Sequence, residues 1–142
     1  LIMNQFNFLL DEENAADLVK SIPYAEYLGI KIETNLNGQM MFRMPFDKKL
    51  IGNPTIKAIH GGILAGFMES SATLAVIGII SHDHLPKCVN MTVEYLRSTR
   101  PVDTFCQVQI NNPGRRIVHL TVRCWQEGRG DVSLAHCRFL AS

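Results

Sequence analysis

The longest apolar run in the chain, residues 58–80 (AIHGGILAGFMESSATLAVIGII), places the strongest limit on its fold. The run contains a single carboxylate, Glu69, and the pair Gly61-Gly62 follows His60 near its start. Glu69 and three neighbouring serine or threonine residues argue against a membrane span. We therefore predict a buried helix of about 18 residues. A charged group costs free energy in apolar surroundings, so Glu69 should either reach a polar cleft or take part in chemistry.

The residues before this run predict a helical segment and a hairpin. Acidic residues at 11–13 favour a helix start, Pro23 interrupts the helical pattern, and Gly29 ends it. Residues 30–35 and 39–45 alternate as strands, and the Asn37-Gly38 pair between them is a strong hairpin signal. Residues 47–57 are expected to form a loop because they contain Gly52-Asn53-Pro54.

Four further strands are predicted after the apolar helix, at residues 89–96, 102–110, 117–125 and 132–140. In the first of them, Val89, Met91, Val93 and Tyr95 are expected to face the core. Short connections imply antiparallel pairing, and a long sheet can curl around one helix and bury it. The fold class is therefore α+β, with about six strands around one helix. The 142 residues are expected to form one domain, with residues 1–28 as an N-terminal helical segment.

Composition narrows the partners and the compartment. The formal net charge of +1 gives no electrostatic reason to expect a nucleic acid or an anionic membrane as partner. The four cysteines form no C-x-x-C pair, so we expect reduced thiols, no metal site and a cytoplasmic location. The first ten residues, LIMNQFNFLL, make a poor signal peptide.

Several motifs together resemble the hotdog-fold acyl-CoA thioesterases, in particular the PaaI-like branch that includes 4-hydroxybenzoyl-CoA thioesterases. The resemblance rests on His60-Gly61-Gly62, on an acid nine positions after that histidine, on the strand V-N-M-T-V-E-Y-L-R at 89–97, and on R-P-V-D at 100–103. It covers roughly residues 25–140. It implies the hotdog fold, in which a curled antiparallel sheet wraps one long helix.

The resemblance also implies roles for residues of the apolar run. Glu69 would activate water or attack the thioester carbonyl, and the Gly61 N–H would polarise that carbonyl. Gly62 would allow the substrate to approach the backbone, although both glycines could equally serve tight packing of a turn. Thr73 would help to hold the acid or its water, or would bond its own backbone. His60 is implied to be a positioning residue rather than the base.

Residues outside the run are implied to bind substrate. Related enzymes carry an Asn or Gln six residues before the histidine, where this chain has Pro54; Asn53, seven residues before, is the candidate for that role. Asn90 and Thr92 would contact the acyl part or a neighbouring subunit. Four arginines could bind the phosphates of coenzyme A or form ordinary solvated surface: Arg97, Arg100, Arg115 and Arg116.

The leading hypothesis is an acyl-CoA thioesterase that works without a cofactor, coenzyme A being part of the substrate. The resemblance implies a homodimer or a dimer of dimers with its site between two protomers. The alternative is a non-catalytic protein that binds acyl-CoA or another acyl ligand on the same fold. A hotdog dehydratase is disfavoured because it would carry a longer, proline-containing histidine motif.

Overall fold

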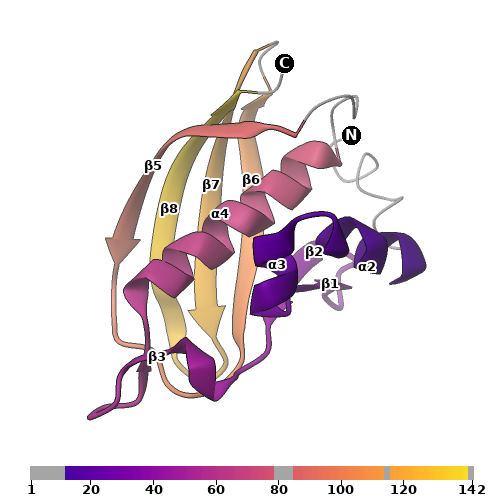
Figure 1. Ribbon diagram of the computed structural model, residues 1–142. Helices are drawn as coiled ribbons and strands as arrows, with labels where there is room; N and C mark the ends of the chain where they lie inside the picture. Colours follow the sequence, from indigo (N-terminus) through magenta and orange to yellow (C-terminus); the bar gives the residue numbers. More distant parts are fainter. Residues whose placement is uncertain (1–11, 79–84, 114–115, 141–142) are drawn as a thin grey trace.

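A computed structural model describes residues 12–78, 85–113 and 116–140. One long helix, α4 (Gly61–Ile77), crosses the face of a curved sheet, and two short N-terminal helices lie beside it (Figure 1). The predicted helix is therefore present, with 17 residues. It begins at Gly61, since Ala58 and Ile59 belong to a short strand, β4 (Ala58–Ile59).

The main sheet has six strands, and every neighbouring pair is antiparallel. Its spatial order is β1-β2-β6-β7-β8-β5, so β1 and β5 are the edge strands. The strands are β1 (Lys31–Thr34), β2 (Met40–Met44), β5 (Lys87–Tyr95), β6 (Thr104–Pro113), β7 (Ile117–Gln126) and β8 (Gly130–Leu140). This confirms the predicted antiparallel sheet around a single helix.

The predicted hairpin joins β1 and β2. Asn35 Oδ1 accepts hydrogen bonds from the backbone N–H groups of Asn37 and Gln39, each at 2.9 Å. Gly38 takes a φ of 76°, a conformation that glycine adopts without steric cost. The side chains of Phe42 and Met44 then point into the core, as the alternation of β2 predicted.

The segment 47–57 is not the plain loop that we expected. It contains a 3₁₀ turn, η2 (Lys48–Leu50), and a short strand, β3 (Ile51–Asn53), which pairs with β4. Ile51 lies opposite Ile59, and the His60 N–H donates to the Leu50 carbonyl at 2.9 Å. Glycine and proline mark this segment as a turn, but the pairing depends on long-range contacts of Leu50, which is fully buried.

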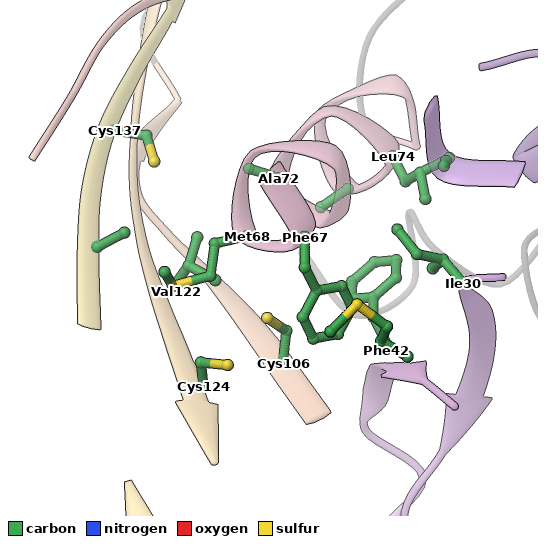
Figure 2. Packing of buried hydrophobic residues seen from close by; sticks show 14 of the residues in the cluster. Ile30, Phe42, Phe67, Met68, Ala72, Leu74, Cys106, Val122, Cys124 and Cys137 are labelled. Atoms are coloured by element: carbon green, nitrogen blue, oxygen red, sulfur yellow. The ribbon is translucent and has the colours of Figure 1, made fainter. Parts of the chain in front are cut away.

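The core lies between α4 and the sheet. Ten residues of α4 are buried, and Figure 2 shows Phe67 and Met68 directed toward the sheet side chains around Phe42 and Cys106. All four cysteines lie in the described part of the chain as free thiols; Cys88 is half-buried and the other three are buried. The sheet covers only the side of α4 that faces it.

The N-terminal helices cover another part of α4. These are α2 (Glu12–Lys20) and α3 (Pro23–Leu28), with Pro23 at the first turn of α3 and Gly29 ending it at a φ of 72°. The expected start at Asp11 lies outside the described residues. A Cβ at Gly66 would lie 2.5 Å from the Tyr24 ring, so this close approach of α3 to α4 requires glycine.

The edge strand β5 departs from simple alternation. Its register shifts between Cys88 and Asn90, so Val89 is an extra residue and is 51% exposed. Met91 and Val93 lie opposite the buried Cys137 and Ala135, whereas Val89 does not face the core. Tyr95 lies opposite the buried Ser133 on the α4 side of the sheet, but its side chain is exposed at the end of the strand. The predicted face of this strand is therefore wrong at Val89, because this residue lies in a β-bulge that interrupts the alternation.

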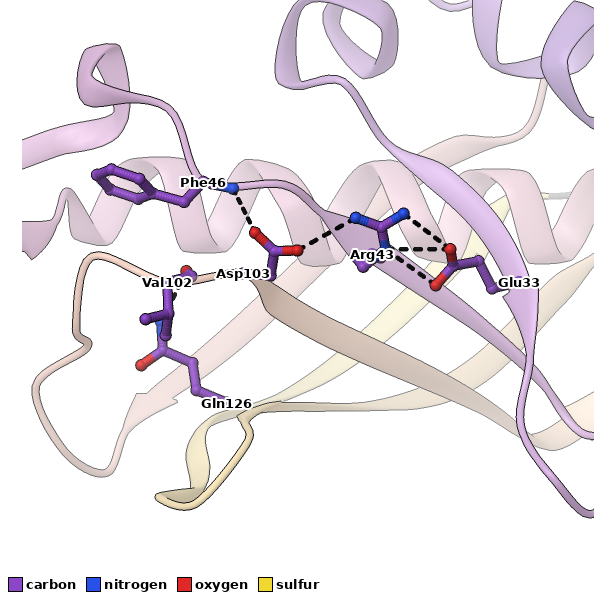
Figure 3. Close-up of polar contacts among 6 residues, drawn as sticks. All are labelled: Glu33, Arg43, Phe46, Val102, Asp103 and Gln126. Carbon is purple, nitrogen blue, oxygen red and sulfur yellow. Dashed lines mark hydrogen bonds and ion pairs between the residues drawn. The ribbon is translucent and has the colours of Figure 1, made fainter.

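A polar network ties β1, β2 and β6 together (Figure 3). The Arg43 guanidinium donates to both carboxylate oxygens of Glu33 at 2.9–3.0 Å and to Asp103 at 3.1 Å. The hydrogen bond with Glu33 raises the pKa of Arg43 further. Asp103 also accepts the Phe46 N–H at 2.8 Å. The network fixes the start of β6, where the R-P-V-D motif ends.

In the described ranges, no helix combines the length and the apolar character that crossing a bilayer would require.

Truncation of the core side of α4 should be severe. Phe67→Ala removes a side chain with no exposed surface, and substitutions of this kind cost about 3–5 kcal/mol. Leu36→Ala is the matched control, because Leu36 is fully exposed and should change the free energy of unfolding by less than about 0.5 kcal/mol. Urea denaturation followed by circular dichroism measures both. Equal midpoints for the two variants would contradict the packing described.

Candidate functional site

The candidate site begins where β4 turns into α4. His60 is the N-cap of the helix, and its Nδ1 accepts the Gly62 N–H at 2.9 Å. This satisfies one of the free donors of the first turn, a task that usually falls to Ser, Thr, Asp or Asn. A neutral imidazole that accepts at Nδ1 carries its proton on Nε2. His60 therefore positions the turn, in agreement with the role that the resemblance implied.

The Gly61 N–H is directed away from the helix. The carbonyl of the same peptide unit, that of His60, accepts from the N–H groups of Ile63 and Leu64 at 2.9 and 3.1 Å. The C=O and N–H of a trans peptide point in opposite directions. Because the C=O points into the helix, the N–H projects from its N-terminus, and no acceptor among the described residues takes it. Such a group favours a negative or partly negative oxygen.

Tight packing around His60 explains the glycines. A Cβ at Gly52 would lie 2.7 Å from the His60 Cα, and a Cβ at Gly62 would lie 3.0 Å from its imidazole. The close packing at Gly52 and Gly62 is a structural role, and the chemical role that the resemblance implied for Gly61 and Gly62 stays a prediction.

Glu69 is exposed, so the acid of the apolar run does not lie in the core. Within α4 only Gly62 and Glu69 are exposed, and they are seven residues apart. Seven residues are about two helical turns, so both lie on one face. The sheet and α3 leave this strip of the helix uncovered. The apolar run therefore exposes one carboxylate in line with its own N-terminus.

Two thiols from the sheet lie beside the Glu69 carboxylate. Burial, and then the charge of Glu69, raises the pKa of Cys88. Burial raises the pKa of Cys137 to about 12, with smaller effects from Cys88 and Glu69. Both thiols therefore stay protonated at neutral pH.

Thr73 lies one turn after Glu69 and is half-buried. Its Oγ1 donates to the backbone carbonyl of Glu69 at 2.9 Å. Of the two roles considered from the sequence, the structure contains the bond to its own backbone.

Asn53 lies at the end of β3, in the β3–β4 connection. Its side chain is exposed, and Oδ1 accepts the Thr55 N–H at 3.1 Å. The amide oxygen of Asn53 thus stabilises the turn in which it lies. This local role explains why an asparagine stands beside Pro54.

Asn90 and Thr92 lie on the face of β5 that points away from α4. They are opposite the exposed Arg138 and His136, and Asn90 Oδ1 accepts from Arg138 Nε at 3.0 Å. Within one chain, the sheet therefore separates both residues from Glu69.

The arginines do not form one group. Arg97 and Arg100 follow the end of β5, close to the N-terminus of α4, whereas Arg116 precedes β7 at the other end of the sheet. The nine-residue rise along β7 separates these ends by about 30 Å. Arg97 Nη1 donates to the Arg129 carbonyl at 2.7 Å, a contact that holds two turns together. Arg115 lies outside the described residues.

Three residues that sequence reasoning did not single out organise this end of the molecule. Tyr95 Oη donates to the Gly61 carbonyl at 2.8 Å, and Asp103 anchors the start of β6. Gln126 is 1% exposed; it accepts the Arg100 N–H at 2.9 Å and donates to the Arg100 carbonyl at 3.0 Å. Gln126 is a polar residue in the last position of an apolar strand, and this pattern could have indicated a buried side chain that needs hydrogen-bond partners.

Other features of the described residues add little to the site. They contain no group of three or more His, Cys, Asp and Glu side chains that could hold a metal ion. A hollow of about 860 Å³ lies between the N-terminal helices and β1, lined by residues such as Val19, Glu26 and Ile32. None of the predicted site residues lines it.

A family model described as the acyl-CoA thioesterase N-terminal domain matches residues 52–141. A protein from Chromobacterium violaceum of known structure is 31% identical, with 98% of this chain and 97% of that chain covered and a TM-score of 0.74. A thioesterase structure from Haemophilus influenzae has a TM-score of 0.79 at 20% identity, covering 92% of this chain and 90% of that one. The latter shows the shared hotdog fold.

A curated relative from Halobacterium salinarum, which carries the provisional name of an esterase, is 30% identical over 102 residues. The match covers 63% of this chain and 64% of that protein's length.

Replacement of the histidine cap should destabilise the protein. His60→Ala leaves the Gly62 N–H without its acceptor, and losing an N-cap side chain costs about 1 kcal/mol. His60→Asn supplies another acceptor and should retain most of the wild-type free energy of unfolding. Urea denaturation compares the three proteins. If the alanine and asparagine variants lost equal stability, capping would not be the role of His60.

The raised pKa of Cys137 should make the protein less stable at alkaline pH. Below the ordinary thiol pKa of 9.0, both folded and unfolded states keep the proton, and the stabilising effect is fully present. As pH rises from 9 toward 12, only the unfolded state releases it, so the free energy of unfolding falls. Cys137→Ala should flatten this decline in urea titrations between pH 8 and 10.5. An unchanged slope in that variant would exclude Cys137 as a source.

Proposed function

Because the chain belongs to the family of acyl-CoA thioesterase N-terminal domains, we propose that it hydrolyses an acyl-CoA thioester to coenzyme A and a carboxylic acid. One observation carries this proposal: of all residues in the apolar helix α4, only Gly62 and Glu69 are exposed, on one face. The same helix begins with an outward-directed Gly61 N–H. A donor for an oxyanion and an acid that can act on water are the two parts that the reaction requires.

In the proposed reaction, the Gly61 N–H binds the thioester carbonyl oxygen and stabilises the negative charge that develops on it. Glu69 either removes a proton from the attacking water or attacks the carbonyl carbon itself. If Glu69 activates water, the C–S bond of the tetrahedral intermediate then breaks, and the sulfur of coenzyme A takes the proton that Glu69 removed. If Glu69 attacks, the C–S bond breaks to leave an anhydride on Glu69; the sulfur takes a proton from water, and the resulting hydroxide hydrolyses the anhydride to the carboxylic acid and free Glu69. His60 positions the turn instead of serving as base, which its occupied Nδ1 supports. The reaction uses water and requires no cofactor.

We further propose that two copies of the chain form the site, as a homodimer or a dimer of dimers. Gly61 and Glu69 of one chain are eight residues apart, or about 12 Å along the helix axis. A second copy could bring its own Glu69 nearer to the Gly61 N–H. The β5 edge, with Val89, Tyr95 and Leu96 at 47–55% exposure, supports this arrangement because an unpaired edge with apolar side chains favours association.

For the nucleotide part of coenzyme A we propose the end of the sheet that carries Arg100. This arginine lies in the loop after Tyr95, which contacts Gly61, and its backbone is held by the buried Gln126. Arg97 is engaged with a carbonyl group, and Arg116 could contribute only from another copy because of its distance. Asn90 and Thr92 would likewise serve an adjoining copy.

The alternative, a protein that binds acyl-CoA without hydrolysing it, is favoured by Asn53. Its side chain is engaged in a local turn, so the polar helper implied by the resemblance is otherwise occupied. Both functions use the same helix start, and turnover separates them.

Loss of the acid should abolish turnover. Glu69→Gln keeps the size of the side chain but removes its basicity, so release of free thiol from a panel of acyl-CoAs should fall about 100-fold or more. Glu26→Gln is the matched control, because Glu26 is an exposed carboxylate on α3 and should keep wild-type rates. A thiol-reactive chromophore measures both. Equal release by Glu69→Gln and wild type would remove Glu69 from the mechanism, and binding of acyl-CoA without release by wild type would favour the alternative.

A further inference from the structure

The peptide unit between Gly61 and Gly62 is held at both of its ends by side chains. Its carbonyl, that of Gly61, accepts from Tyr95 Oη at 2.8 Å. Its N–H, that of Gly62, donates to His60 Nδ1 at 2.9 Å. The three groups thus form a continuous chain of hydrogen bonds through one peptide, and such chains strengthen one another by polarisation.

This peptide needs external restraint because a glycine stands on each side of it. Glycine populates backbone conformations that other residues avoid, so a Gly-Gly peptide can rotate at small cost. Any rotation would disturb the first turn of α4, from which the Gly61 N–H projects. The two side chains remove that freedom from opposite directions: His60 lies within the turn, whereas Tyr95 reaches it from the sheet.

Tyr95 also stands beside the Gly61 backbone. Its ring atoms lie 3.4 and 3.5 Å from the place where a Cβ of Gly61 would be, and its side chain remains 55% exposed. The Tyr95 ring therefore lies next to the Gly61 backbone, and its hydroxyl group restrains the Gly61–Gly62 peptide. Because the Tyr95 side chain is exposed, a substrate entering the site could lie along it.

We propose that Tyr95 is a positioning residue of the thioester site, whose phenol fixes the Gly61–Gly62 peptide and thereby the direction of the Gly61 N–H. The inference rests on the proposed hydrolysis. It has a consequence for assembly, because Tyr95 is the last residue of β5, the edge strand at which we propose a second copy to bind. Association at that edge would steady the strand that restrains the helix start.

Tyr95→Phe tests the proposal because it keeps the ring and removes only the hydroxyl. We expect kcat for acyl-CoA hydrolysis to fall about tenfold, less than for loss of an oxyanion donor itself, with KM changed less than about twofold. The matched control is Tyr27→Phe, since Tyr27 Oη has no hydrogen-bond partner among the described residues and its ring lies under Lys49 instead. The control should keep the wild-type kcat.

A second readout does not depend on activity. In Tyr95→Phe the Gly62 amide should exchange with solvent at least about fivefold faster, as loss of one hydrogen bond predicts. The Leu64 amide, which donates to the His60 carbonyl, should exchange at its wild-type rate, because the helix itself stays intact. Amide exchange measured by NMR resolves these two positions.

The outcomes separate the two proposals. A lowered kcat together with faster Gly62 exchange supports the role of Tyr95. A wild-type kcat in Tyr95→Phe overturns it, as does equal acceleration at Gly62 and Leu64, which would mean general fraying. If the wild-type protein releases no thiol from any acyl-CoA, the hydrolysis proposal fails and the positioning role fails with it.

Discussion

The burial of α4 is the constraint on which the rest of the structure depends. The helix is apolar on nearly every side, and a single curved sheet cannot surround it. The sheet therefore takes one part of its surface and α3 another, with Tyr24 in contact with Gly66. What remains uncovered is a narrow strip with Gly62 and Glu69. The candidate site is thus the part of α4 that neither the sheet nor α3 covers. The packing of the core therefore determines where the site lies and which way it faces.

The two ends of that strip are prepared in different ways. At the helix start, the candidate groups belong to the backbone of the first turn, and His60, Tyr95 and close-packed glycines hold that backbone in place. Further along, the candidate group is the Glu69 side chain, whose charge adds to the effect of burial in raising the pKa of the Cys88 and Cys137 thiols, so both thiols remain protonated at neutral pH. A preorganised N–H dipole can stabilise negative charge that develops on one oxygen, and a carboxylate can accept a proton that leaves another. The two groups together suit a reaction of that kind.

Features set by local sequence were predictable, and features set by distant contacts were not. Asn37-Gly38, Gly29 and the long apolar run each define their element through backbone preferences or periodicity. The bulge at Val89 and the bond from Tyr95 to Gly61 join segments far apart in the chain, and no local pattern encodes them. Glu69 illustrates the limit: the cost of burying a charge indicated that the acid would reach a polar cleft or take part in chemistry, but the face of α4 that stays uncovered is decided by its neighbours. The arginines show the same limit, since strand length places Arg97 and Arg100 at the opposite end of the sheet from Arg116.

The contact between Tyr24 and Gly66 has a consequence for the history of the chain. A methyl group at position 66 would stand 2.5 Å from the outer end of the tyrosine ring, so a side chain there requires that the ring turn outward or that position 24 become smaller. A smaller residue at position 24 removes the clash without exposing more of the ring. Across descendants of a common ancestor, residues 24 and 66 should therefore covary in size, and a small residue at 24 should mark lineages in which 66 is no longer glycine.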